Sequence, residues 1–249
     1  SEDHPIKTSQ GFIKAGQLDN THKLSVNYFT GVPYEKIENE QKTAILAKVL
    51  GYFIGDGTLY STHKRGKPVF GARAYGKWDD LEKLRTDIEH LGYSVGLHER
   101  TRDHEIKTLY GVSKFTATCA ELYVNSQEFC NLLLSAGMPL GKKTKIEFSV
   151  PDWIMKSPLW IQRLFLAGFF GAELSKPKTI TKTGFGMPFI GMNKNTVVKD
   201  NGRLFLIQLM ELLSGFGVQC SKIHERKEID NQDGPVTMLR LFIESDEDN

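Results

Sequence analysis

Cysteine is scarce in this chain of 249 residues, and the spacing of its three cysteines is wide. Cys119, Cys130 and Cys220 form neither a CxxC pair nor an even set at short intervals. Close pairs are typical of zinc sites, and even sets are typical of disulfide-linked secreted domains. We therefore expect three structural thiols in a reducing compartment.

Long apolar runs are also lacking, since none reaches the roughly 18–20 residues that a bilayer-spanning helix needs. The first residues, SEDHP, do not combine a basic segment with an apolar core, so we expect no signal peptide. These absences predict an intracellular, cytoplasmic protein that does not bind membranes. The composition, 40% hydrophobic and 25% charged, is ordinary for one large domain or two small ones.

Net charge is small as well, at +2, but the basic residues are clustered. One cluster is Lys142, Lys143 and Lys145, whereas much of the acidic charge lies elsewhere, including the end of the chain. A nearly neutral chain can still present one basic face to nucleic acid. Solvated surface charge is the alternative explanation.

An internal repeat is the main feature that is present. Residues 42–54 (KTAILAKVLGYFI) and 157–170 (SPLWIQRLFLAGFF) are apolar nearly all round, which predicts two buried helices. After each helix we expect a loop, a strand, a second helix and a further strand. The predicted strands and helices are 69–75, 79–91 and a strand ending at 98–100 in the first repeat, and 188–193, 202–213 and a strand ending at 224–226 in the second.

The first repeat continues with a predicted strand at 120–125 and a helix at 127–136, and the second with a strand at 237–244. This order predicts an α+β fold of two similar halves, because repeats of this length decide the architecture. We expect a polar loop after the first helix, with Gly57 in the left-handed position past the helix C-terminus.

Small residues recur on one face of each predicted helix. Gly51 and Gly55 lie four apart in the first, as Gly168 and Ala172 do in the second. Such a spacing lets two helix backbones approach more closely than the usual distance of about 8–10 Å. We therefore predict that these four residues form the interface between the two helices.

Each predicted helix also ends in a carboxylate, Asp56 in the first and Glu173 in the second. Helix C-termini are negative poles, so two carboxylates brought together there repel each other. A divalent cation would remove the repulsion, and oxygen ligands favour Mg²⁺. Such a cation could polarise a phosphate and generate an attacking hydroxide. A structural helix end is the alternative for either copy alone.

These two segments resemble the paired motifs of the LAGLIDADG homing endonucleases. Residues 49–57 (VLGYFIGDG) are similar to the first motif and residues 166–174 (LAGFFGAEL) to the second. Residues 137–143 (GMPLGKK) and 150–154 (VPDWI) resemble the approach to the second motif in archaeal intein-borne members. The resemblance covers residues 42–244, most of the chain.

The resemblance implies a pseudo-two-fold saddle of αββαββα halves, with the motif helices packed at its centre and the sheets over DNA. It implies that Asp56 and Glu173 bind Mg²⁺, for which Mn²⁺ would substitute, and that Lys142 and Lys143 are the basic catalytic residues. The implied activity is cleavage of both strands of a long, asymmetric duplex target by a monomer, leaving 3′ overhangs.

Two positions depart from the motif. Glu173 replaces the commoner aspartate, and Leu174 replaces the final glycine. A leucine in a left-handed cap would be strained by roughly 1–2 kcal/mol, so we expect the second helix to end differently from the first. Unequal activity of the two centres would follow.

The N-terminal stretch has a resemblance of its own. Residues 1–5 and 11–18 are similar to the histidine-containing block of self-splicing inteins, so residues 1–38 are assigned to an intein-like (Hint) remnant or extension. Residues 39–150 and 151–249 form the two LAGLIDADG halves. We find no first intein block with its starting Cys or Ser, and the chain ends in Asp248-Asn249 instead of His-Asn. We therefore expect no splicing by this chain and treat His4 as a remnant or as half of an incomplete splicing domain.

Alternating side chains on strands are candidates for contacts with bases in the major groove. The candidates are Arg73, Tyr75, Lys77, His98, Arg100, Arg102, Lys222, His224 and Arg226. A solvated strand face is the alternative. Two other functions stay open: a non-cleaving RNA maturase or DNA-binding regulator on the same scaffold, and an unrelated α/β enzyme with a fortuitous repeat.

Overall fold

The computed structural model describes residues 2–24, 32–108, 111–176, 178, 186–231 and 234–243. The chain divides into two compact units, residues 1–33 with 177–186, and residues 34–176 with 187–249. The larger unit contains both motif helices. Among the described residues, no helix is both long enough and apolar enough to cross a membrane.

The larger unit has an α+β fold, as the repeat predicts. Its first half is an αββαββα arrangement made of α1 (Glu40–Asp56), β3 (Gly57–Lys64), β4 (Lys67–Gly76), α2 (Trp78–His90), β5 (Gly96–Thr108), β6 (Gly111–Val124) and α3 (Gln127–Ser135). The second half consists of α4 (Asp152–Met155), α5 (Leu159–Glu173), β7 (Phe189–Asn195), a 3-10 turn (Thr196–Val198), α6 (Lys199–Ser214), β8 (His224–Asn231) and β9 (Gly234–Phe242). Residue 244, the end of the predicted last strand, lies outside the described residues.

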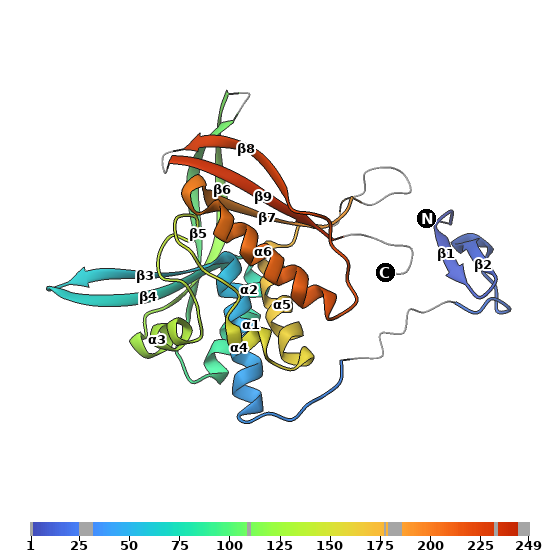
Figure 1. Cartoon of the computed structure of the whole chain (residues 1–249), viewed down its shortest axis with the longest axis horizontal. Coiled ribbons are helices and arrows are strands. Elements are labelled where there is room, and N and C mark those ends of the chain that lie inside the picture. Colours follow the sequence, from blue (N-terminus) through green and yellow to red (C-terminus); the bar gives the residue numbers. More distant parts are fainter. Residues whose placement is uncertain are drawn as a thin grey trace. The chain divides into compact units, whose positions relative to one another are not determined.

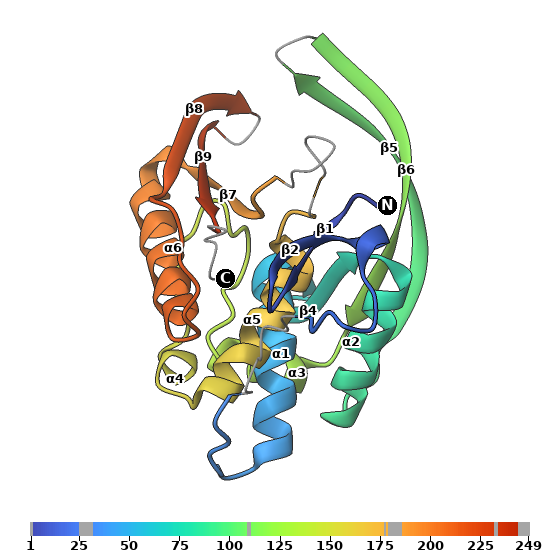
Figure 2. The same ribbon diagram turned by 90° about the vertical axis from the view of Figure 1, so that its right-hand side faces the viewer.

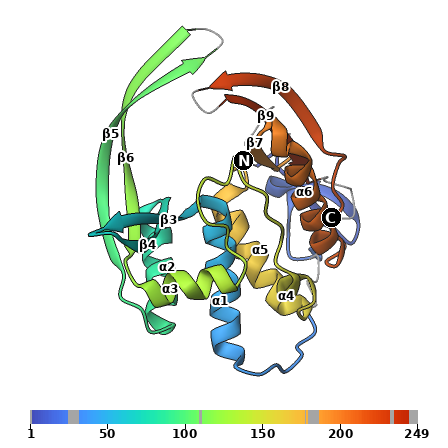
Figure 3. The same ribbon diagram turned by 60° about the vertical axis from the view of Figure 1, so that its left-hand side comes forward.

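Two antiparallel sheets flank the helices, with strand orders β3-β4-β6-β5 and β7-β9-β8. Helices α1 and α5 lie side by side at the centre of the unit (Figure 1). The β5–β6 hairpin rises on one side of this pair and the β8–β9 hairpin on the other (Figures 2 and 3). The core fills the space between the sheets and the helices, and Phe53, Phe165 and Phe205 are fully buried in it. Two sheets on either side of a central pair of helices agree with the predicted α+β arrangement of two halves.

A strand, β3, stands where we expected a polar loop after the first helix, so that expectation is wrong. It pairs with β4 from Gly57 opposite Ala74 to Lys64 opposite Lys67. The turn between the strands has positive φ at Arg65 (51°) and Gly66 (76°), the conformation of tight two-residue hairpins. Most residues of β3 are polar, so its sequence shows no clear strand pattern, although Leu59 is buried in the core.

The backbones of α1 and α5 touch through glycines. A β-carbon on Gly51 would overlap the carbonyl oxygen of Phe165, and one on Gly168 would overlap that of Lys48. At Gly55, a β-carbon would lie 2.6 Å from that of Ala172. Each helix thus presents a glycine to a carbonyl of the other, and the four small residues of the sequence prediction all lie at this contact.

Both motif helices end in the same way. Gly57 has φ −92° and ψ 166°, and Leu174 has φ −70° and ψ 130°, so both are extended. The N–H of Gly57 donates to the carbonyl of Phe53, and that of Leu174 to the carbonyl of Phe170. The expected left-handed Gly57 and the expected difference between the two helix ends are therefore both wrong, because each helix passes directly into extended backbone.

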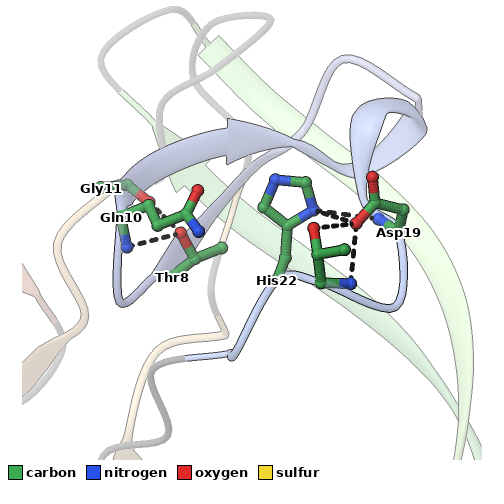
Figure 4. A network of polar contacts seen from close by, with 6 residues as sticks. Thr8, Gln10, Gly11, Asp19 and His22 are labelled. Atoms are coloured by element: carbon green, nitrogen blue, oxygen red, sulfur yellow. Dashed lines mark hydrogen bonds and ion pairs between the residues drawn. The ribbon is translucent and has the colours of Figure 1, made fainter.

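The smaller unit contains a hairpin of β1 (Pro5–Thr8) and β2 (Gly11–Lys14), followed by a 3-10 turn (Ala15–Gln17). The Thr8 hydroxyl closes the hairpin turn by donating to the carbonyl of Gly11 at 2.8 Å and accepting from the N–H of Gln10 at 3.1 Å (Figure 4). A second turn is closed by the N–H of Asp19, which donates to Nδ1 of His22 at 3.1 Å (Figure 4). These bonds are local to the unit.

We predict that Gly168→Ala lowers the free energy of unfolding by about 1–3 kcal/mol, because the added methyl group overpacks the helix contact. Gly171→Ala in the same helix is the matched control, since a β-carbon there would meet nothing within 4 Å. It should raise stability by about 0.5–1 kcal/mol, because alanine favours a helix over glycine. Urea denaturation measures both, and equal stabilities would contradict the backbone contact.

Candidate functional site

The side chains of Asp56 and Glu173 come together because they end the two helices that touch. A β-carbon on Gly55, one residue before Asp56, would lie 3.1 Å from Cγ of Glu173, so the glutamate lies against the end of α1. Burial raises the pKa of the Glu173 carboxyl, and the charge of Asp56 raises it further. Desolvation also raises the pKa of Asp56, although Asp56 is an exposed residue and Glu173 is half-buried. Burial thus disfavours ionisation of both carboxyls, and the Lys143 ammonium opposes this effect at each of them.

Lys143 caps the end of α1. Its Nζ donates to the carbonyl of Ile54 at 2.7 Å, to that of Phe53 at 3.3 Å and to that of Gly55. These carbonyls form the negative pole of the helix, so the ammonium group offsets charge where Asp56 also stands. Burial lowers the pKa of Lys143 to about 8, against the opposing effect of Glu173 and Asp56. The neighbouring Lys142 is exposed.

The connection between α3 and α4 holds Lys143 in this place. Gly141, with φ 98°, donates its N–H to the carbonyl of Leu59 in β3 at 2.9 Å. The carbonyl of Thr144 accepts the N–H of Asn195 in β7 at 2.7 Å. The connection is therefore attached to both halves of the unit, on either side of Lys143.

A cavity of about 210 Å³ adjoins Lys143 and Glu173. The rest of its lining is Ile54, Thr144, Phe148, Phe169 and residues 190–194 of β7. A water molecule occupies roughly 30 Å³, so the cavity has room for several. Polar groups and space for water thus lie beside the Glu173 carboxylate.

The donors present fit a hard divalent cation. Among the described residues, there is no group of three or more His, Cys, Asp or Glu side chains that could hold a metal. Two carboxylates at negative helix poles fit a cation that keeps several waters or takes phosphate oxygens, as Mg²⁺ does. They do not fit a four-ligand structural zinc site.

The first sheet presents a basic face on the side opposite its helices. Ala72 and Ala74 of β4 are buried toward the helices, so Arg73 and Tyr75 point the other way. On β6, Glu121 is paired with Tyr75 of β4 on one side and with His98 of β5 on the other, so these three side chains share a face. Arg100 and Arg102 follow His98 at alternate positions and point the same way. The candidates brought together on this face are Arg73, Tyr75, His98, Arg100 and Arg102.

Glu121 organises this face, and the sequence analysis missed it. Its side chain is only 3% exposed; Oε1 lies 2.8 Å from Nη1 of Arg73, and Oε2 lies 3.0 Å from Nη1 of Arg100. The Arg73 guanidinium also lies 5.1 Å from the ring centroid of Tyr60. The alternation of β6 could have located Glu121, because Ala120 and Leu122 on either side are buried toward the helices.

The second sheet carries fewer of the predicted contacts. His224 and Arg226 are exposed on β8, opposite Arg240 and Met238 of β9. Two other candidates are not on strands, and there the alternation argument is wrong. Lys77 is the residue before α2, and Lys222 lies two residues before β8.

No family model matches the chain. The tRNA-splicing ligase RtcB of Pyrococcus furiosus is 33% identical over 261 residues, which cover 92% of this chain and 26% of that protein. The DNA-directed RNA polymerase subunit Rpo1N of Methanocaldococcus jannaschii is 32% identical, over 88% of this chain and 19% of that protein. The replication factor C small subunit of the same organism is 28% identical, over 88% and 12%. The chain spans about a quarter or less of these relatives.

Two solved structures are similar at low sequence identity. One is the homing endonuclease I-WcaI bound to its DNA recognition sequence, with 15% identity, a TM-score of 0.43, and coverage of 85% of this chain and 84% of that one. The other is the LAGLIDADG meganuclease I-AabMI bound to uncleaved DNA, with 11% identity, a TM-score of 0.35, and coverage of 79% and 78%.

We predict that Asp56→Asn stabilises the protein in EDTA at pH 7. A carboxyl whose pKa is raised by folding contributes stability below its unfolded pKa of about 3.9, and this is lost as pH rises through the folded pKa. An asparagine side chain does not ionise, so the variant should have a higher free energy of unfolding than wild type at pH 7. The difference should vanish below about pH 4, where Asp56 is protonated in both states. Thermal melts between pH 3 and 8 measure it.

The control for this prediction is Asp152→Asn on α4, whose side chain is 85% exposed. It should change the free energy of unfolding by less than about 0.5 kcal/mol. If Asp56→Asn is no more stable than wild type at pH 7, the carboxylates are not crowded as described.

We predict that Glu121→Gln lowers the free energy of unfolding by about 1.5–3 kcal/mol, because two guanidinium groups lose their shared charged acceptor. The control is Glu105→Gln, which removes the partner of Lys114 from an exposed ion pair 3.0 Å long on the same hairpin. That change should cost less than about 1 kcal/mol. Chemical denaturation compares the two, and similar losses would contradict the organising role of Glu121.

Proposed function

We propose that this chain is a LAGLIDADG homing endonuclease carried by an intein. It would be a monomer that cuts both strands of a long, asymmetric DNA site in a metal-dependent reaction and leaves 3′ overhangs. The observation that carries the proposal is the meeting of Asp56 and Glu173 at the ends of two touching helices, beside the ammonium of Lys143. The resemblance of both helix ends to the paired motif supports it.

The proposed chemistry divides among these three side chains. The carboxylates of Asp56 and Glu173 hold the cation and are relieved of their mutual repulsion when it binds. Bound Mg²⁺, or Mn²⁺ in its place, supplies polarisation of the scissile phosphate and acidification of water. The Lys143 ammonium adds positive charge where the phosphate oxygens become more negative during cleavage. The neighbouring Lys142 is proposed as a second basic group on the same connection.

The proposed binding surface is the pair of sheet faces. Arginines held by Glu121 present fixed donors, and arginine is the residue that most often recognises guanine in the major groove. His98 and Arg102 extend the first face, while His224 and Arg226 supply the second. Because the two faces differ in sequence and strand length, the proposed target is not a palindrome. Contacts to phosphates make binding weaken as salt rises.

The relatives support an inserted, independent activity. A ligase, a polymerase subunit and a replication factor subunit each contain a segment similar to this chain, which is 12–26% of their length. Their names describe three different activities, so the shared segment does not account for any one of them. A transferable insert that cuts DNA explains why it occurs in such different proteins, and it is consistent with the intein-like N-terminal residues.

We predict that the protein cuts a randomised duplex library in Mg²⁺, and that sequencing of the ends gives discrete sites with 3′ overhangs. Asp56→Asn and Glu173→Gln should each lower cleavage of at least one strand by 10²-fold or more, because each removes a cation ligand. Asp152→Asn, at an exposed position on α4, serves as the control and should cut like wild type.

The outcomes separate the remaining functions. Loss of only one strand's cut in Glu173→Gln would mean that the two centres act on different strands. Duplex binding without any cut in Mg²⁺ or Mn²⁺ would overturn the endonuclease and favour a binding protein on the same scaffold. No duplex binding at moderate salt would overturn both.

A further inference from the structure

Lys194 is a fully buried lysine in β7, with 0% of its surface exposed. Its Nζ donates to the carbonyl of Ile146 at 2.7 Å, to the carbonyl of Lys143 at 3.0 Å and to Oδ1 of Asn201 at 3.4 Å. The same nitrogen lies 4.0 Å from the ring centroid of Phe148. All the direct acceptors are neutral, so the ammonium is held by backbone and amide oxygens within the protein.

Burying this side chain works against stability. Burial lowers the pKa of Lys194 to about 8, with Glu147 opposing and the charge of Lys143 adding to the shift, so the charged form is disfavoured there. A glycine in α6 makes room for it, because a β-carbon on Gly202 would lie 2.6 Å from Cγ of Lys194. Glycine inside a helix is itself unfavourable relative to alanine. A buried methionine or leucine would avoid the charge, so the ammonium group calls for a reason beyond packing.

Two of the three hydrogen bonds of Lys194 go to the connection that carries Lys143, at the carbonyls of residues 143 and 146, and the third goes to Asn201 of α6. This connection lacks regular helix or strand between α3 and α4, and its backbone needs partners from other elements. Asn201 assists by accepting the N–H of Phe148 at 3.0 Å, and Gln208 accepts that of Val150 at 2.8 Å. β7 and α6 thus hold the connection from the second half, while the Lys143 side chain reaches the end of α1 in the first.

We propose that Lys194 is a positioning residue for Lys143 and acts by fixing the carbonyl groups of residues 143 and 146. Through this chain of contacts, the second sheet sets where the Lys143 ammonium lies beside Asp56 and Glu173. The inference rests on the proposed endonuclease function for its catalytic consequence. Its structural content, that Lys194 orders the connection, does not depend on that function.

A double-mutant cycle tests the catalytic consequence. Single-turnover cleavage of the target found in the library experiment is measured for Lys194→Met, Lys143→Met and the double variant. We expect Lys194→Met to lower the rate by about 10²-fold, as a displacement near 1 Å can do. The double variant should be no slower than Lys143→Met, because Lys194 acts through Lys143. DNA affinity in Ca²⁺ should stay within about threefold of wild type.

Two results of the cycle would overturn the proposal. One is a rate for Lys194→Met equal to that of wild type. The other is a double variant whose loss equals the product of the two single losses, which would mean that Lys194 acts on the reaction by a separate route. If Lys194→Met does not fold, Lys194→Gln replaces it, because the amide keeps hydrogen-bond donors without the charge.

Hydrogen exchange tests the structural content without any cleavage. Peptides covering residues 142–148 should exchange at least tenfold faster in Lys194→Met than in wild type, with α1 and α5 unchanged. Lys156→Met is the control, since this lysine is exposed and pairs with Asp152 on α4. Unchanged exchange at 142–148 would overturn the proposal by itself. A wild type that cuts no duplex would instead overturn the proposed function, whatever the exchange shows.

Discussion

Gly51 of α1 and Gly168 of α5 each receive a carbonyl group of the opposite helix, so two backbones meet where side chains normally keep helices apart. The arrangement of the whole larger unit depends on this contact. The two sheets lie on either side of this helix pair (Figure 3), and Asp56 and Glu173 come together at the helix C-termini. Any side chain larger than glycine at these positions would separate the helix ends, and with them the carboxylates.

The site gathers ionisable groups whose charged forms the fold disfavours. Burial raises the pKa of both carboxylates and lowers the pKa of Lys143 and of Lys194. A protein selected only for stability would have no reason to assemble such a set. A polyvalent ligand that carries its own charges, such as a cation together with a phosphate, would balance the carboxylates and the ammonium of Lys143 at once. The proposed cation and phosphate would account for groups whose charged forms burial disfavours.

The sequence predicts the large elements well because they depend on simple periodicities. The two apolar helices, their small-residue faces and the acidic ends are all where the repeat indicates. The predictions are wrong where contacts with distant parts of the chain determine the local backbone conformation. β3 has a polar sequence, and its pairing with β4 makes it a strand; Gly57 and Leu174 adopt extended backbone because each helix runs directly into the next segment.

Glu121 and Lys194 escaped the sequence analysis for a related reason. Both are charged residues in strands, where solvation is the ordinary expectation, and their burial depends on partners far away in the sequence. Strand alternation places Lys194 in the inward series of Ile190 and Met192, but alternation does not reveal that residues 143 and 146 would accept from its ammonium. Strand alternation can assign Glu121 and Lys194 to a face of their sheets, but the partners that bury them are known only from the folded structure.

The β5–β6 hairpin is long, with strands of 13 and 14 residues, whereas β8 and β9 have 8 and 9. At about 3.3 Å per residue, the first hairpin extends about 40 Å, more than one turn of duplex DNA, and the second less than one turn. Residues 111–116 of β6 are exposed and contribute nothing to the core. Sequence change in this outer part would therefore alter the proposed DNA-binding face without disturbing the core or the contact between α1 and α5. In the proposed endonuclease, recognition and cleavage would therefore rest on different parts of the chain, and the first could change without the second.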